Sequence, residues 1–221
     1  MTLPAPRAVL FDLDGTLADT APDLAGAINR IRVRRGLAPT PYEQLRPFAS
    51  AGARGLIGAS FGLKPGDEGY DALRIAFLDE YEATIAEQSR LFSGMGETLA
   101  GLETRGIAWG IVTNKAARFT EQLVPLIGLA HAACVVSGDT TPHSKPHPAP
   151  LLEASRQLQV DAEDCWYVGD DLRDIQAGKA AGMTTIAAAW GYCGTAGPAD
   201  WNADAQLASP AEILDLIAAA H

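Results

Sequence analysis

Short apolar runs alternate with helix-patterned segments along most of this 221-residue chain, and this alternation narrows the folds open to it. Apolar runs bounded by polar turns predict buried strands. Five such runs are AVLF at residues 8–11, IAWGIVTN, ACVVSGD, CWYVGDD and TTIAAAWG. Strands that alternate with helices at this spacing are typical of βαβ units, so the pattern predicts an α/β fold with a parallel sheet flanked by helices.

The predicted helices follow from apolar residues spaced three and four apart. They lie near residues 95–105, 116–127, 148–158 and 171–181, between the strand-like runs. The tail SPAEILDLIAAA predicts one more helix, with Ser209 as its N-cap and Pro210 at its first position.

One block departs from the alternation directly after the first strand. The segment APDLAGAINRIRVRRG and residues 41–90 carry helical patterns without a convincing strand. A helical block inside an alternating pattern indicates an insertion. We therefore expect an all-helical cap domain at residues 18–90, inserted into a core domain made of residues 1–17 and 91–221.

The composition argues against several classes of partner. The 17 basic and 27 acidic residues give a net charge of -10, which disfavours nucleic acid and anionic membranes. No apolar run approaches the roughly 20 residues of a membrane span, and the first residues do not resemble a secretory signal. Cys134, Cys165 and Cys193 lie far apart, which favours free thiols and a cytoplasmic location. The net charge does not exclude a small anionic substrate, because binding such a substrate needs positive charge only at the site itself.

Polar and charged side chains follow the predicted strands where these end, or lie in the adjoining loops. Taken singly they have ordinary interpretations, since a Thr-Asn pair is a common helix cap and a lysine before proline is usually solvated. In an open α/β sheet, however, ligands bind beyond the carboxyl ends of the strands, so we expect these side chains at one rim. The set is Asp12, Asp14, Thr113, Asn114, Lys145, Asp170, Asp171 and Asp174.

The aspartates of this set bring an excess of negative charge to the rim. Two carboxylates about 4 Å apart repel each other by on the order of 4 kcal/mol at an effective dielectric constant of 20. A hard cation with oxygen ligands relieves this repulsion, and Mg²⁺ fits best. The ion and a lysine can together hold a phosphate group, toward which a carboxylate is an established nucleophile. The rim therefore predicts phosphoryl chemistry.

The motifs DLDGT, TN, the lysine of SKPHP and GDDLRD resemble the four motifs of the haloacid dehalogenase superfamily, and the likeness spans essentially the whole chain. The resemblance implies a Rossmann-like parallel sheet with a helical cap of the phosphoglycolate phosphatase and phosphoglucomutase branch. Dehalogenases lack an aspartate at the position of Asp14 and need no metal, so its presence implies phosphoryl transfer. GARGLIGASFG, RLFSGM, WGIVTNKAARF and VGDDLRDIQAG are similar to the N-acetylmuramic acid 6-phosphate phosphatases of cell-wall recycling.

The resemblance implies a role for each acidic residue of the first and last motifs. Asp12 is expected to be the nucleophile that forms an aspartyl-phosphate. Asp14 is expected to be the general acid and base, which protonates the leaving oxygen and then activates water. The expected Mg²⁺ ligands are Asp12, the backbone carbonyl of Asp14, and Asp170.

The remaining roles concern the phosphoryl oxygens and the support of the site. Thr113, Asn114 and Lys145 are expected to hold the phosphoryl oxygens. Asp174 is expected to orient metal-bound waters or Lys145 from behind, and Asp171 is a further candidate for this support.

The loop ASAGARGLIG of the predicted cap is the candidate for substrate selection. Gly52, Gly55 and Gly58 permit close backbone approach, and Arg54 lies among them as a lone cation. Arg54 either is solvated or pairs with a carboxylate or phosphate of the substrate. The second reading predicts a small phosphorylated sugar acid or carboxylic acid as substrate, either N-acetylmuramic acid 6-phosphate or 2-phosphoglycolate. Together with the resemblance described above, it implies a preference for N-acetylmuramic acid 6-phosphate.

Two other functions fit the same motifs. A phosphosugar mutase would share every residue named above, and an inactive phosphoryl-binding module would keep the site without turnover. Intact carboxylates and lysine disfavour the inactive module. We expect a monomer or a homodimer.

Overall fold

Six parallel strands form one sheet in the computed structural model, which describes residues 3–195 and 197–220. The strand order is β5-β4-β1-β6-β7-β8, so β1 (Ala8–Phe11) lies in the middle. The other strands are β4 (Ala108–Val112), β5 (Val135–Val136), β6 (Cys165–Gly169), β7 (Thr184–Ala188) and β8 (Ala205–Leu207). The predicted parallel sheet is confirmed, and β8 is an addition that the sequence pattern did not predict.

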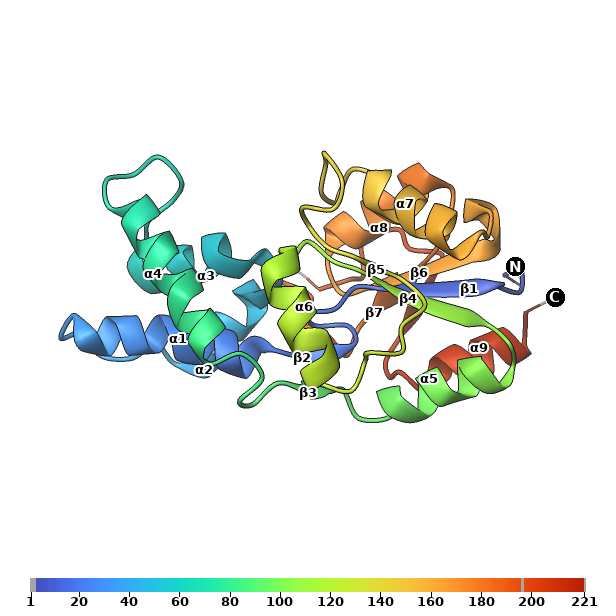
Figure 1. Ribbon diagram of the computed structural model, residues 1–221, viewed down its shortest axis with the longest axis horizontal. Coiled ribbons are helices and arrows are strands. Elements are labelled where there is room, and N and C mark those ends of the chain that lie inside the picture. Colours follow the sequence, from blue (N-terminus) through green and yellow to red (C-terminus); the bar gives the residue numbers. More distant parts are fainter. Residues whose placement is uncertain (1–2, 196, 221) are drawn as a thin grey trace.

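Helices cover both faces of this sheet (Figure 1). One face packs against α5 (Met95–Thr104), α6 (Ala117–Leu126) and α9 (Glu212–Ala218), and the other against α7 (Ala149–Leu158) and α8 (Leu172–Ala181). Successive strand side chains point to opposite faces. In β1, Val9 and Phe11 therefore join the first layer, while Ala8 and Leu10 join the second.

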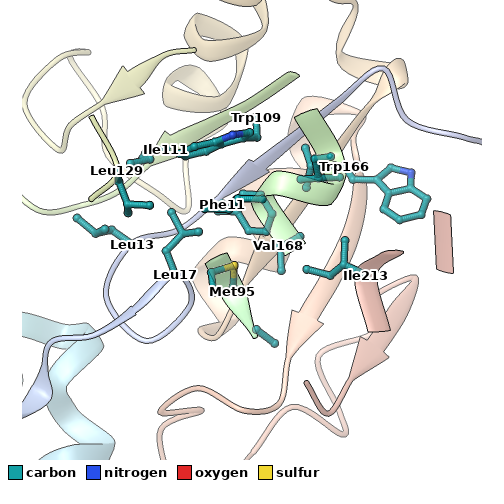
Figure 2. Packing of buried hydrophobic residues seen from close by; sticks show 14 of the residues in the cluster. Phe11, Leu13, Leu17, Met95, Trp109, Ile111, Leu129, Trp166, Val168 and Ile213 are labelled. Atoms are coloured by element: carbon teal, nitrogen blue, oxygen red, sulfur yellow. The ribbon is translucent and has the colours of Figure 1, made fainter. Parts of the chain in front are cut away.

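The first layer holds the larger aromatic side chains. Figure 2 shows Phe11 of the central strand among Trp109, Trp166 and Met95. All four are nearly inaccessible to solvent. This packing fixes β1, and with it the residues that follow the strand, because interiors at this density tolerate little displacement.

The last helix begins later than the sequence predicts. Its first residue is Glu212 and Ala211 is the N-cap, so the prediction of Ser209 as the cap is wrong. Ser209 instead accepts the backbone N–H of Glu212 on its carbonyl and donates from its hydroxyl to the Glu212 side chain. These bonds close a turn one step before the helix and replace the expected cap.

A helical segment lies to one side of the sheet (Figure 1). It contains α1 (Ala21–Arg34), α2 (Tyr42–Leu45), a 3-10 turn (Arg46–Ala51), α3 (Gly52–Phe61) and α4 (Tyr70–Ala83). Its buried side chains form their own apolar cluster, which Phe119 of α6 and Tyr192 also join. The expected helical block is therefore present, and we propose that it is the cap domain.

Two short strands join the helical segment to the sheet. The strands β2 (Ala18–Asp19) and β3 (Arg90–Leu91) pair antiparallel, with Ala18 opposite Leu91. The sequence pattern predicted no strand here, because two residues are too few to show an alternation. Within the described part of the chain, no helix has the length and apolar character of a membrane span.

Candidate active site

The carboxyl ends of β1, β4 and β6 meet at one edge of the sheet. The last residue of β1 is in register with the penultimate residues of both neighbours, so Asp12, Thr113 and Asp170 all follow at this edge. A cavity of about 560 Å³ opens there. Its lining includes seven of the residues predicted from sequence, namely Asp12, Asp14, Thr113, Asn114, Lys145, Asp171 and Asp174. The eighth, Asp170, is fully buried beside Asp12.

Lys145 is buried at the floor of this cavity with its ammonium fully engaged. Its Nζ lies 2.9 Å from Oδ1 of Asp12 and 2.7 Å from Oδ1 of Asp174. It also donates to the Val112 carbonyl at 3.0 Å and the Tyr167 phenol at 2.8 Å. Burial disfavours the charged ammonium, but the Asp12 and Asp174 carboxylates outweigh it and raise the pKa of Lys145. A fixed positive charge therefore lies against Asp12.

The side chains of the TN motif support this lysine and the next loop. Nδ2 of Asn114 donates to the Lys145 carbonyl and Oδ1 accepts the Lys145 N–H, each at 2.9 Å. The hydroxyl oxygen of Thr113 accepts the Lys115 N–H at 3.1 Å. In this structure the Asn114 amide thus positions the backbone of Lys145.

Asp170 is held by donors from three separate parts of the chain. Its Oδ1 accepts the Thr16 hydroxyl at 3.0 Å, and its Oδ2 accepts the Ser50 hydroxyl at 3.1 Å and the Tyr192 N–H at 2.9 Å. Gly15 passes so close, with φ of +92°, that a Cβ there would lie 2.2 Å from Oδ2. Burial, followed by the charges of neighbouring carboxylates, raises the pKa of Asp170 to about 8.

The donor set at this point suits a divalent cation. Carboxylate oxygens of Asp12, Asp170 and Asp174 all lie within 4.8 Å of one another and are buried. Oδ1 of Asp12 lies 2.9 Å from Nζ of Lys145 and has no other polar partner among the described residues. Burial, partly offset by Lys145, raises the pKa of Asp12 to about 6. Crowded, desolvated carboxylates such as these fit a hard cation.

Asp174 differs from Asp170 because one of its oxygens is paired with the Lys145 ammonium. Oδ1 accepts from Lys145, and Oδ2 accepts the Asp171 N–H at 3.1 Å. Asp171 in turn caps α8 and pairs with Arg173, whose guanidinium outweighs burial and lowers the pKa of Asp171. These contacts place Asp174 as a support of Lys145 and Asp171 as a helix cap.

Asp14 lines the same cavity and has its own cation. Its Oδ1 accepts the Thr20 hydroxyl and lies 3.1 Å from Nζ of Lys115. Lys115 also donates to the Tyr81 phenol at 3.0 Å, and Tyr81 belongs to α4 of the helical segment. The two predicted carboxylates of DLDGT are therefore each paired with a different buried lysine.

Arg54 is not brought to the cavity. Its side chain is exposed, and it is absent from the described lining, whose loop residues here are Ser50, Ala51, Gly52 and Ala53. Arg173 approaches this loop instead and donates to the Ser50 carbonyl at 2.9 Å. Of the three glycines singled out in the loop, only Gly52 is at the lining, while Gly55 packs tightly on the Phe48 backbone.

Several residues of the site were missed by the sequence analysis. Lys115 follows the TN motif directly, and Arg173 lies inside GDDLRD, so position next to a motif could have indicated both. Thr16 lies inside DLDGT and Ser50 inside the loop ASAGARGLIG, but neither motif indicates their hydrogen bonds to Asp170, which join positions far apart in the chain.

Comparisons with known proteins agree with this geometry. The family described as haloacid dehalogenase-like hydrolase matches residues 9–188. The chain is 41% identical over 213 residues to the N-acetylmuramic acid 6-phosphate phosphatase of Pseudomonas putida, which covers 96% of each chain. It is 43% identical over 210 residues to a phosphoglycolate phosphatase of Xanthomonas campestris, covering 94% of this chain and 95% of that one.

Among solved structures, a "predicted phosphoglycolate phosphatase" from Haemophilus somnus superposes with a TM-score of 0.85 at 26% identity. It covers 96% of this chain, and this chain covers 97% of it. Family match, relatives and architecture point the same way. The chain belongs to the haloacid dehalogenase-like hydrolases, among relatives that are named phosphatases.

Proposed function

We propose that this phosphatase is a Mg²⁺-dependent phosphomonoesterase in which Asp12 takes the phosphoryl group from the substrate and then releases it to water. The observation that carries the proposal is the position of Asp12. Its carboxylate lines the cavity, and its buried Oδ1 lies 2.9 Å from the Lys145 ammonium. A carboxylate so placed is accessible to a ligand and faces a cation that attracts phosphate.

Asp12, Asp170 and the backbone carbonyl of Asp14 would hold the metal ion. When bound, Mg²⁺ supplies positive charge that screens Asp12 from an anionic substrate and stabilises the charge of the transition state. Asp170 suits this task because its three donors fix the carboxylate in place. Asp174 suits it less, because one of its oxygens is already paired with the positive charge of Lys145.

The protein groups account for both halves of the reaction. An oxygen of Asp12 bonds to phosphorus as the ester P–O bond breaks, and Asp14 gives its proton to the departing alcohol oxygen. Asp14 then takes a proton from a water molecule, whose oxygen bonds to phosphorus as the bond to Asp12 breaks. Lys145 and Thr113 would hold the phosphoryl oxygens throughout, and Asn114 would contribute by fixing the backbone of Lys145.

The substrate is proposed to be a small phosphorylated acid, either N-acetylmuramic acid 6-phosphate or 2-phosphoglycolate. Relatives of similar identity carry names for each of these activities. The cavity of about 560 Å³ lies within the size range of small-molecule sites and is large enough for a phosphorylated sugar acid. We propose N-acetylmuramic acid 6-phosphate as the preferred substrate because the cavity is large enough for it and because the motifs of this chain resemble those of the phosphatases named for it.

The deciding experiment measures phosphate release from both compounds by the purified protein, with Mg²⁺ and with EDTA. We expect release that requires Mg²⁺ and no bisphosphate activator, with a higher kcat/KM for N-acetylmuramic acid 6-phosphate. Dependence on a bisphosphate with isomerised product would identify a mutase. Binding of phosphate without turnover of any phosphomonoester would identify an inactive module.

The role of Arg54 stays a prediction, since the structure places its side chain outside the cavity. The same assay with Arg54→Ala tests it. A raised KM for acid substrates would show that Arg54 reaches them when the helical segment moves, and unchanged constants would assign Arg54 to the solvated surface.

A further inference from the structure

The cavity contains two buried lysines whose hydrogen bonding differs. Lys145 contacts two carboxylates, a carbonyl and a phenol, which uses all the donors of its ammonium. Lys115, whose side chain is 7% exposed, has two polar partners among the described residues, Asp14 and Tyr81. An ammonium has three N–H donors, so one N–H of Lys115 is left over at the cavity wall.

Tyr81 carries a second donor that has no partner among the described residues. Its phenol oxygen accepts from Lys115 at 3.0 Å, but no acceptor is found for its own O–H in the part of the chain that the structure describes. The residue is 1% exposed and lines the same cavity. Burial raises the pKa of Tyr81, so the hydroxyl keeps its proton at neutral pH. Two adjacent, buried donors therefore face the cavity without an acceptor.

We propose that Lys115 and Tyr81 together bind a carboxylate on the leaving group of the substrate. This inference rests on the proposed phosphatase reaction, in which Asp14 faces the leaving oxygen. A carboxylate has two oxygens with several lone pairs, which matches an N–H donor and an O–H donor side by side. Leaving such buried donors without an acceptor costs free energy, so the site favours a substrate that satisfies them.

The position of Lys115 fits this role geometrically. Its Nζ is 3.1 Å from Asp14, and a general acid is itself about 3 Å from the oxygen it protonates. The ammonium therefore lies within about 6 Å of the scissile oxygen, the sum of two hydrogen-bond lengths. A carboxylate on the carbon skeleton of a small phosphorylated hydroxy acid is within reach.

The other cations near the cavity are less suited to the task. Arg173 forms a two-pronged pair with Asp171 and also donates to the Ser50 carbonyl. Arg118 and Arg74 are exposed at the cavity lining, where solvent weakens any pairing with an anion. Lys115 is a buried cation beside Asp14, where the leaving group of the substrate would lie. We therefore assign the preference for acidic substrates to Lys115.

The faces of two aromatic rings hold the Lys115 ammonium in place. Its Nζ lies 4.5 Å from the centroid of the Tyr81 ring and 6.0 Å from that of Phe119. Such contacts favour a cation over a neutral group at this position. The ring of Tyr81 also comes from the helical segment, so the pair of donors is complete only where α4 meets the sheet edge.

The test compares substrates that differ at the carboxylate. The pairs are N-acetylmuramic acid 6-phosphate with its lactyl amide, and 2-phosphoglycolate with its amide. The proteins are wild type, Lys115→Met, Tyr81→Phe and, as a matched control, Lys64→Met, which makes the same change at an exposed lysine outside the described cavity lining. The readout is the ratio of kcat/KM for the acid to kcat/KM for its neutral counterpart. If Lys115 only positioned Asp14, its loss would lower kcat/KM for both compounds by the same factor and leave the ratio unchanged.

We expect the wild-type enzyme to prefer the acid in at least one pair. Lys115→Met should lower that ratio by about 10- to 100-fold, as expected for loss of a charge-assisted hydrogen bond, and Tyr81→Phe by a smaller factor in the same direction. Lys64→Met should keep the wild-type ratio. An unchanged ratio in both cavity variants, or a wild-type enzyme without preference for either acid, would overturn the inference while leaving phosphatase activity intact. If wild type hydrolyses none of the four compounds, both the proposed function and this inference are rejected.

Should Lys115→Met fail to fold, as judged by circular dichroism, Tyr81→Phe alone decides. It deletes one oxygen and keeps the ring that packs in the apolar cluster of the helical segment. A ratio equal to that of wild type in this variant would then reject the proposal.

Discussion

The backbone N–H of Tyr192 donates a hydrogen bond of 2.9 Å to Oδ2 of Asp170. The phenol oxygen of the same tyrosine accepts the backbone N–H groups of Thr20 and Ala21 at 2.7 and 2.8 Å, where α1 begins. One residue therefore links the proposed metal carboxylate to the start of the helical segment. Its neighbour Gly191 packs on the same carboxylate, since a Cβ there would lie 2.3 Å from Cβ of Asp170.

This arrangement predicts different effects for two neighbouring substitutions. Gly191→Ala should displace Asp170 and weaken Mg²⁺ binding by about 10- to 100-fold, as is typical when support of a metal ligand is lost. Tyr192→Phe keeps the N–H bonded to Asp170, so Mg²⁺ affinity should change little. It should lower the free energy of unfolding by about 1–3 kcal/mol, because two buried N–H groups lose their acceptor. Mg²⁺ titration calorimetry and urea unfolding of both variants check this, and equal Mg²⁺ affinities would contradict the role of Gly191.

Asp12→Asn should abolish phosphate release, because an amide is a poor nucleophile and a poor metal ligand. The amide has nearly the same shape as the carboxylate, so the fold should be kept, and circular dichroism with thermal unfolding serves as the control. Near-native turnover in this variant would contradict the proposed mechanism directly.

Asp14 and Asp170 should separate by their response to metal. Asp170→Ala should raise the Mg²⁺ concentration required for half-maximal rate, with partial recovery at high Mg²⁺. Asp14→Asn should lower kcat by about 10²- to 10⁴-fold through loss of proton transfer, without recovery at any Mg²⁺ concentration. Identical Mg²⁺ curves for the two variants would show that the roles are assigned wrongly.

The stability of the metal-free protein should fall as the pH rises from about 4 to about 8. Burial raises the pKa of Asp170 from 3.8 to about 8, so in this range the folded state binds more protons than the unfolded state. Its contribution to stability is complete below pH 4 and is lost as the pH passes the folded pKa. Urea unfolding in EDTA at several pH values should show this slope, and Asp170→Asn should reduce it. Added Mg²⁺ should restore stability most at high pH, where the carboxylate is ionised.

Much of the site could be predicted because parallel strands end at a common edge. AVLF marks a buried strand by its apolar character alone, and Asp12 must then lie at its carboxyl end. The same argument placed Thr113 and Asp170 nearby, and the register of β1 with β4 and β6 bears out that proximity.

The remaining contacts follow from tertiary structure and have no local pattern. Tyr192 lies 172 residues from Thr20 in the chain, and WGYCG by itself is compatible with an ordinary turn. The role proposed for Lys115 depends on its contact with Tyr81, which lies on α4 of the helical segment. Arg54 shows the converse, since a lone cation in a glycine-rich loop indicated a ligand although its exposed side chain does not line the cavity.

The pairing of β2 with β3 has a mechanical consequence. Both passages of the chain between the helical segment and the sheet run side by side and are hydrogen-bonded to each other, with Asp19 opposite Arg90. Two separate tethers would permit sliding and twisting, whereas a bonded ribbon bends as one piece. A displacement of the helical segment from the sheet would therefore bend both strands together, and it would change the distance between Tyr81 and Lys115.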